Sequence, residues 1–161
     1  MIKEIGAKQK GDIAEARIAE LVVLYGEKAL ACYRPITDEE GIDLIVKEKG
    51  ASLRTIFLQV KSRFNLTKKG KAFVAHVKTR SILDNYRMAV VFCYFDLSKG
   101  DLNDKIWLVP APEFIQMANK LKSGLLGFVA SPKPGLKNKW NKYLIDKQSL
   151  ADELIKLMSK L

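Results

Sequence analysis

The 161-residue sequence has few residues of the types that build several common kinds of site. A single histidine, His76, excludes a zinc site with several histidine ligands and a nuclease that depends on histidines, so we expect His76 to be a strand residue. The two cysteines, Cys32 and Cys93, are far apart and each lies beside an aromatic residue in apolar sequence. We therefore predict two buried, unpaired thiols in a reducing cytoplasm.

Long apolar runs are also missing. No apolar segment approaches the roughly 20 residues that a membrane span needs, and the first residues lack the apolar core of a signal peptide. The composition, 48% hydrophobic and 29% charged, is that of an ordinary globular protein. We expect one domain over residues 1–161, because no repeat or linker divides the chain. From the lack of long apolar runs we expect a cytoplasmic protein with no membrane partner.

Acidic residues are absent from two long stretches. The net charge is +10, from 28 Lys and Arg against 18 Asp and Glu. No Asp or Glu occurs from Lys49 to Leu83, which contains nine Lys or Arg, or from Phe114 to Ile145, which contains six Lys. Cations of this density favour a polyanion, since neutralising phosphates supplies most of the sequence-independent affinity for nucleic acids. The alternative is a basic surface without a partner.

Apolar periodicity and turn residues predict the elements of structure. Ala14, Ile18, Leu21 and Val22 form a helical stripe, and the segments 42–47 and 54–61 form a hairpin across a glycine-bearing turn. We expect the region of Ser131 to Gly135 to be a loop. The predicted helices are 9–25, 79–86, 113–122 and about 149–161, and the predicted strands are 29–35, 42–47, 54–61, 72–77, 88–95 and 105–109.

Within the mostly apolar runs 41–46 and 56–61 of this hairpin only three side chains are polar, namely Asp43, Gln59 and Lys61. Side chains alternate along a strand, so Gln59 and Lys61 point to the same face. A carboxylate, an amide and an ammonium on neighbouring strands suit a cation and a phosphate. Glu15 falls at the edge of the buried helical stripe, where an acid can face the sheet. Each residue also has an ordinary interpretation, as a strand end, a solvent-facing strand position or a helix-surface acid.

The order of these elements, with Glu15, Gly41-Ile-Asp43 and Gln59-Val-Lys61, resembles the PD-(D/E)XK nuclease superfamily, in particular the branch of Holliday-junction resolvases and Mrr-type endonucleases. The resemblance covers about residues 8–110. It implies an α/β, restriction-endonuclease-like fold with an αβββαβ core and a mixed central sheet flanked by helices. Residues 111–161 would be an extension that ends in an extra C-terminal helix.

The resemblance also implies a metal-dependent DNA endonuclease that hydrolyses phosphodiester bonds. Glu15, Asp43, Gln59 and the main-chain carbonyl of Val60 would hold Mg²⁺ or Mn²⁺, and Lys61 would position water or neutralise developing charge. Gln59 stands where the motif prefers Asp or Glu, and an amide offers the metal an oxygen without charge. The alternative is therefore a nucleic-acid-binding module on the same fold with little or no catalysis.

Further basic residues are candidates for contact with nucleic acid. Lys137, Lys139 and Lys142 are interleaved with Trp140, a pattern that suits backbone contact and base stacking; the alternative is that Trp140 and Tyr143 are core residues. A homodimer would suit a substrate with two symmetric strands, and the apolar face of the C-terminal helix could serve assembly or its own core. The remaining candidates for nucleic-acid binding are Arg63, Lys68, Lys69 and Lys71.

Overall fold

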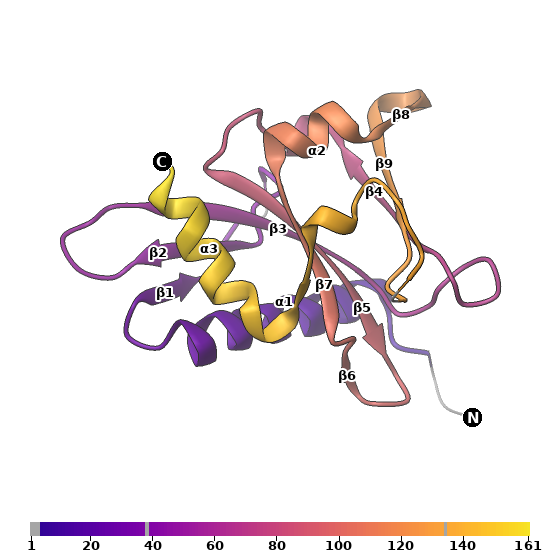
Figure 1. Cartoon of the computed structure of the whole chain (residues 1–161), viewed down its shortest axis with the longest axis horizontal. Coiled ribbons are helices and arrows are strands. Elements are labelled where there is room, and N and C mark those ends of the chain that lie inside the picture. Colours follow the sequence, from indigo (N-terminus) through magenta and orange to yellow (C-terminus); the bar gives the residue numbers. More distant parts are fainter. Residues whose placement is uncertain (1–3, 38, 134) are drawn as a thin grey trace.

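A computed structural model describes residues 4–37, 39–133 and 135–161. Its centre is a seven-stranded mixed sheet (Figure 1). The strand β3 pairs with β5 in parallel, and all the other neighbours in this sheet are antiparallel. In spatial order the strands are β1 (Leu30–Tyr33), β2 (Leu44–Glu48), β3 (Thr55–Arg63), β5 (Met88–Asp96), β7 (Lys105–Pro110) and β10 (Leu144–Asp146), with the short β6 (Asp101–Leu102) paired to β5.

The predicted hairpin is confirmed. In it Leu44 lies opposite Leu58 and Val46 opposite Ile56, and all four side chains are buried. Between these positions the alternate residues of β3 point to the other face of the sheet. The hydrophobic alternation thus fixes the register, since a slip of one residue would turn the buried set outward.

A second, three-stranded antiparallel sheet packs beside the central one. Its strand order is β4 (Phe73–Lys78), β9 (Leu125–Ala130) and β8 (Asn119–Leu121). Strand β4 lies in the connection between β3 and β5, whereas β8 and β9 follow β7 in the chain. The small sheet is therefore assembled from segments that are far apart in sequence, and Figure 1 places it at the upper right.

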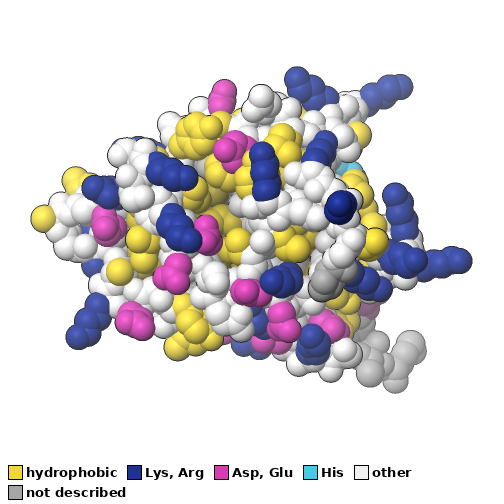
Figure 2. All heavy atoms as spheres, in the orientation of Figure 1, with side chains coloured by type: hydrophobic (Ala, Val, Ile, Leu, Met, Phe, Trp, Pro, Cys, Tyr) yellow, Lys and Arg dark blue, Asp and Glu magenta, His cyan; other side chains and the backbone are white. Residues whose placement is uncertain are grey.

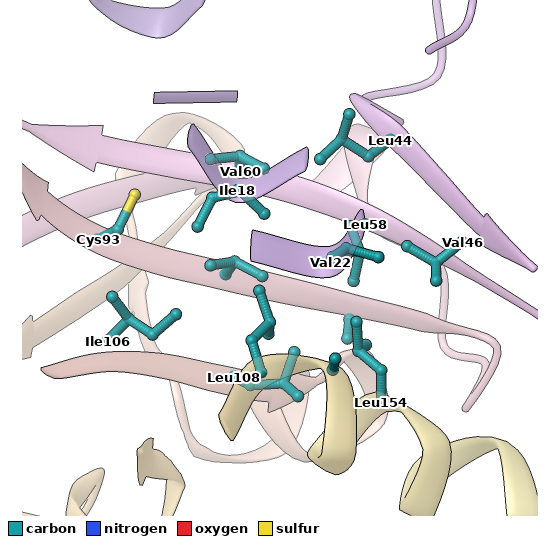
Figure 3. Close-up of a cluster of buried hydrophobic side chains, with 14 of the residues drawn as sticks. Ile18, Val22, Leu44, Val46, Leu58, Val60, Cys93, Ile106, Leu108 and Leu154 are labelled. Carbon is teal, nitrogen blue, oxygen red and sulfur yellow. The ribbon is translucent and has the colours of Figure 1, made fainter. Parts of the chain in front are cut away.

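One face of the central sheet is covered by two helices, α1 (Ala7–Gly26) and α3 (Leu150–Ser159). Their buried residues join those of the sheet in one hydrophobic cluster, which Figure 3 shows with Ile18, Val22, Leu58, Val60 and Leu154 pointing toward one another. The apolar face of α3 is thus largely occupied by the protein's own core. No helix in the described part of the chain is both long enough and apolar enough to cross a membrane.

The opposite face of the central sheet packs on the small sheet and on the helix α2 (Ala111–Met117) through an aromatic cluster. Phe92 and Phe128 stack at 3.8 Å between ring centroids, and Phe73, Trp107 and Trp140 surround them. These rings are fully buried. The molecule thus has two cores, one on each face of the central sheet.

The predicted helix 79–86 is wrong. Only a single 3-10 turn, Thr79–Ser81, forms there. Leu83 and Tyr86 are more than half exposed, so the segment has too little apolar surface to bury as a helix. Asn85 instead makes a turn, accepting from the main-chain N–H of Arg87 at 2.8 Å.

The predicted helix 113–122 is correct only in part, because α2 ends at Met117 and residues 119–121 form the edge strand β8. Strands β6, β8, β9 and β10 were not predicted. The short strands β6, β8 and β10 have too few residues for a clear alternation, whereas the apolar run of β9, from Leu125 to Ala130, carried a signal for a strand. Both cysteines are free, and Cys93 is fully buried while Cys32 is half-buried.

Candidate active site and nucleic-acid interface

The Asp43 carboxylate sits where β2 begins and directly contacts β3. The main-chain N–H of Asp43 donates to the Leu58 carbonyl at 2.8 Å, and its Oδ2 accepts from the main-chain N–H of Val60 at 2.7 Å. The side chain thus provides Val60 with the acceptor that a further residue of β2 would otherwise supply. Asp43 closes the hairpin ladder and at the same time places its negative charge beside the segment of Gln59 to Lys61.

The carbonyl of Val60 is directed to the same side of β3 as this carboxylate. In an extended strand the N–H and C=O of one residue point to the same neighbour, and the N–H of Val60 points to Asp43. Leu58 is directed the same way, because its carbonyl accepts from Asp43. Gln59 pairs with Val90 of β5 on the other side. A main-chain oxygen and a carboxylate are thereby brought to one edge of the strand.

Gln59 is almost completely buried, with 3% of its surface exposed. Its Nε2 donates to Ser81 Oγ at 3.2 Å, and the Ser81 hydroxyl donates in turn to the Lys78 carbonyl at 2.8 Å. Its Oε1 has no hydrogen-bond partner among residues 4–37, 39–133 and 135–161. A buried acceptor without a donor costs about 1–3 kcal/mol, so this oxygen is suited to a cation or to a water held by one.

Gly41 makes the close packing around Gln59 achievable. It has φ +72°, and a Cβ added there would lie 2.6 Å from the Ser81 carbonyl oxygen and 2.9 Å from Gln59 Nε2. A side chain at position 41 would thus meet both the main chain of the turn after β4 and the Gln59 amide. The glycine of the Gly-Ile-Asp segment serves to seat Gln59 as well as to turn the chain.

Lys61 opens onto a cleft of about 860 Å³ between the first turns of α1, the end of β3 and β4. Lys10 and Arg63 also line this cleft, together with His76 and one acid, Glu4. Arg63 is held in place because its Nε donates to the Val74 carbonyl at 2.7 Å, and Lys10 lies over the Phe64 ring at 5.8 Å. The strand that carries Gln59 and Lys61 therefore runs into a cation-lined recess.

Lys10 and His76 were not predicted as binding residues. Lys10 lies 51 positions before Lys61, so no local spacing relates the two. The only available signal was the expected packing of the first helix against the hairpin, which did not specify which end of the helix meets the site. The exposure of the His76 side chain follows from the alternation of β4, but that pattern gave no indication that the residue lines a cleft.

Glu15 lies on α1 and is engaged with Arg34, which follows β1. The Arg34 Nη2 donates to Glu15 Oε2 at 2.8 Å, and the Glu15 side chain is 21% exposed. Among the described residues no group of three or more His, Cys, Asp or Glu is placed to hold a metal ion. Asp43 and Gln59 thus form the centre of the candidate site, while Glu15 carries an ion pair of its own.

The predicted basic loop is exposed and tightly turned. Lys68, Lys69 and Gly70 all have positive φ, and Thr67 pairs with Ala72 across the turn. Lys71 is exposed as well. The three lysine side chains therefore project from a compact turn that leads directly into β4.

The second basic segment is divided by its packing. Lys137 and Lys142 are exposed, whereas Lys139 Nζ donates to the Met117 carbonyl and, at 3.2 Å, to Asn119 Oδ1. Trp140 is fully buried in the aromatic cluster. The prediction that its ring stacks on bases is therefore wrong for this structure, and the alternative, a core residue, is correct because the ring fills the space beside Phe114 and Phe128.

Comparison with known proteins supports the fold. No protein-family model matches the sequence, and no curated protein matches it. Among solved structures, one described as a bacterial homing endonuclease, I-Ssp6803I, is similar, with a TM-score of 0.60 and 17% sequence identity over 98% of this chain and 97% of that chain. The mixed α/β architecture predicted from the sequence is thus confirmed, and the fold is shared with that structure over nearly the whole length of both chains.

Proposed function

We propose that this protein is a metal-dependent DNA endonuclease of the PD-(D/E)XK type, which hydrolyses phosphodiester bonds. The observation that carries the proposal is the contact between Asp43 and Val60, which joins a carboxylate to the strand bearing Gln59 and Lys61 at the mouth of a cation-lined cleft. The similarity to an endonuclease structure supports the same class of reaction.

The residues present fit a divalent cation. Mg²⁺ usually takes one or two carboxylates and keeps several of its waters, and Asp43 together with the Val60 carbonyl and Gln59 Oε1 offers one carboxylate and two neutral oxygens. The unpartnered Gln59 oxygen is the observation that favours such a group. Glu15 would join the ligands by giving up its ion pair with Arg34 and binding the cation instead. Mn²⁺ suits the same donors.

The bound cation would supply Lewis acidity and a more acidic water. The protein's own residues would do the rest. The Lys61 ammonium would neutralise charge that develops on the phosphate oxygens. Arg63, whose guanidinium is fixed by its bond to the Val74 carbonyl, and Lys10 would hold the phosphates that flank the scissile bond.

The test is cleavage of supercoiled plasmid DNA with Mg²⁺ or Mn²⁺. Asp43→Asn is the variant of choice because an amide oxygen can still accept from Val60, whereas Asp43→Ala would leave that N–H unpaired at a cost of about 1–3 kcal/mol. We expect Asp43→Asn and Lys61→Met to abolish cleavage, and Lys49→Met, in the turn after β2, to retain it. Cleavage that survives Asp43→Asn would refute the site.

A second function, DNA binding without hydrolysis, is favoured by Gln59 and by the Glu15–Arg34 ion pair. Both reduce the negative charge available to a cation. On this hypothesis the protein binds DNA with a steep dependence on salt and none on divalent metal. Calorimetric titration with Mn²⁺ decides between the two functions, since heat that is present in the wild type and absent in Asp43→Asn supports the endonuclease.

A further inference from the structure

The small sheet has one covered and one uncovered face. Phe73, Ala75 and Val77 of β4 are buried against the aromatic cluster. The intervening side chains His76 and Lys78 are exposed. On the neighbouring strands the same outward face carries Asn119, Leu121, Leu125 and Val129, as the register of the sheet requires. We call these six residues the outer face.

Both acid-free stretches of the sequence converge on this sheet. Strand β4 lies within residues 49–83, and β8 and β9 lie within 114–145. The three strands and the turn between β8 and β9 therefore contain no Asp or Glu in a protein with 18 of them. Figure 2 shows Lys and Arg side chains projecting from the right-hand and upper right edges, where Figure 1 places this sheet and the Lys68–Lys71 turn.

We propose that the outer face is the surface by which this protein enters the major groove of duplex DNA and reads its sequence. The inference rests on the proposed function for the identity of the polyanion as DNA. Strands lie about 4.8 Å apart, so the paired strands β4 and β9 with their side chains suit a groove about 12 Å wide, which admits a two-stranded ribbon. Strand β8 would lie along the rim, where Lys122, in the turn that follows the strand, meets phosphates.

The outer face supplies the kinds of group that groove recognition uses. His76 carries a ring nitrogen that donates and one that accepts, and the Val129 side chain, 38% exposed, suits contact with a thymine methyl group. Lys78 can bind a guanine edge or a phosphate. The outer face thus combines apolar and polar groups, and none of its six residues is a carboxylate that would repel the backbone of DNA.

The outer face is continuous with the candidate active site. His76 belongs to the outer face and also lines the cleft that contains Lys61. Its neighbour two residues earlier, Val74, lines the same cleft and is bonded through its carbonyl to Arg63. A duplex on the outer face would therefore place one of its strands at the cleft, so that recognition and hydrolysis act on one bound molecule.

Duplex DNA suits this surface better than duplex RNA. The major groove of A-form RNA is deep and narrow and does not admit side chains from a sheet. The comparison of the two duplexes is thus part of the test. If the cations alone determined binding, both would bind with similar affinity.

The binding experiment uses the full-length protein carrying Asp43→Asn, without divalent metal, and fluorescence anisotropy with a labelled DNA duplex. We expect Lys78→Glu to weaken binding by about tenfold and to reduce the slope of log affinity against log salt by about one. Lys49→Glu is the matched control, since Lys49 is exposed in the turn after β2, remote from the small sheet in Figure 1. Circular dichroism confirms that each variant is folded.

The specificity experiment selects preferred sites from a pool of random duplexes. We expect His76→Ala to lose preference at one base position by about fivefold or more. The inference is overturned if Lys78→Glu binds within twofold of its parent, if Lys49→Glu weakens binding equally, if duplex RNA binds as tightly as duplex DNA, or if His76→Ala and Val129→Ala both leave the selected sequence unchanged.

The outcomes separate this inference from the proposed function. Hydrolysis depends on Asp43 and Lys61 and is measured by cleavage, whereas the outer face is measured by binding in a protein that lacks the Asp43 carboxylate. A protein that cleaves DNA but shows no effect of the outer-face variants would keep the proposed function and overturn the inference. A protein that binds through this face but does not cleave DNA would overturn the proposed hydrolysis and keep the inference about the outer face.

Discussion

Replacing Gln59 with glutamate tests whether this buried side chain faces a cation. Without metal the variant should be less stable, because Gln59 is 3% exposed and its Nε2 would become an oxygen facing the Ser81 hydroxyl, whose hydrogen is already donated to Lys78. An unsatisfied buried acceptor costs about 1–3 kcal/mol. For a protein of this size, roughly 2–4 °C of melting temperature follows each kcal/mol, so we expect a loss of about 2–12 °C in EDTA.

Divalent metal should reverse that loss. A new carboxylate beside Asp43 raises affinity for Mn²⁺, and a ligand present at 100 times its dissociation constant stabilises the native state by about 2.7 kcal/mol. The expected gain is roughly 5–11 °C for Gln59→Glu. The wild type should gain less, since its neutral amide binds the cation more weakly.

The assay is thermal unfolding of the two proteins across a titration of Mn²⁺, with Gln59→Glu/Asp43→Asn as the control that removes the other carboxylate. A destabilised Gln59→Glu protein that metal does not rescue would show that the Gln59 side chain faces no cation site. Rescue of equal size in the double variant would show that Asp43 is not part of it.

Three further predictions concern the packing. Gly41→Ala should destabilise the protein by several kcal/mol, since φ is +72° and the new Cβ would collide with the main chain of the turn after β4. The control Gly50→Ala, at φ +98° with nothing within 4 Å, should cost only about 1–2 kcal/mol. Equal losses in urea unfolding would refute the close packing around Gly41. Burial raises the pKa of the Cys93 thiol to about 12, so thiolate is scarce at neutral pH and only unfolding should expose Cys93 to a thiol reagent, while the half-buried Cys32 reacts slowly in the native state. Trp140→Ala should lower the free energy of unfolding, measured in urea, by about 3–5 kcal/mol. A stable variant that fails to bind DNA would show instead that the Trp140 ring stacks on bases.

The centre of the candidate site was predictable because it depends on local alternation. Continuous apolar runs identified β3 and β5 as buried strands, and within them Gln59 and Lys61 stood out as polar residues on one face. Asp43 stood out at the start of the preceding strand. The structure adds what spacing cannot supply, namely that Asp43 also serves as the acceptor for Val60.

Features that depend on distant pairing were not predictable in this way. Glu15 and Arg34 are 19 residues apart, and nothing in either segment indicates the ion pair. The edge strand β8 has only three exposed residues and was merged with the preceding helix. The sequence did not determine whether the Trp140 ring is buried or exposed, because alternating cations and aromatic residues suit a binding surface and the edge of a core equally. Only the position of the aromatic cluster decides between them.

The two cores on opposite faces of the central sheet have a consequence for how such a protein can diverge. The helices α1 and α3 contribute to one core, and the small sheet and α2 contribute to the other. Changes in the small sheet therefore alter packing on one face and leave the helical layer intact. Leu58 and Val60, which bond to Asp43, belong to the central sheet itself. On the proposed function, lineages descended from this fold could therefore exchange their target sequences while inheriting the same chemistry.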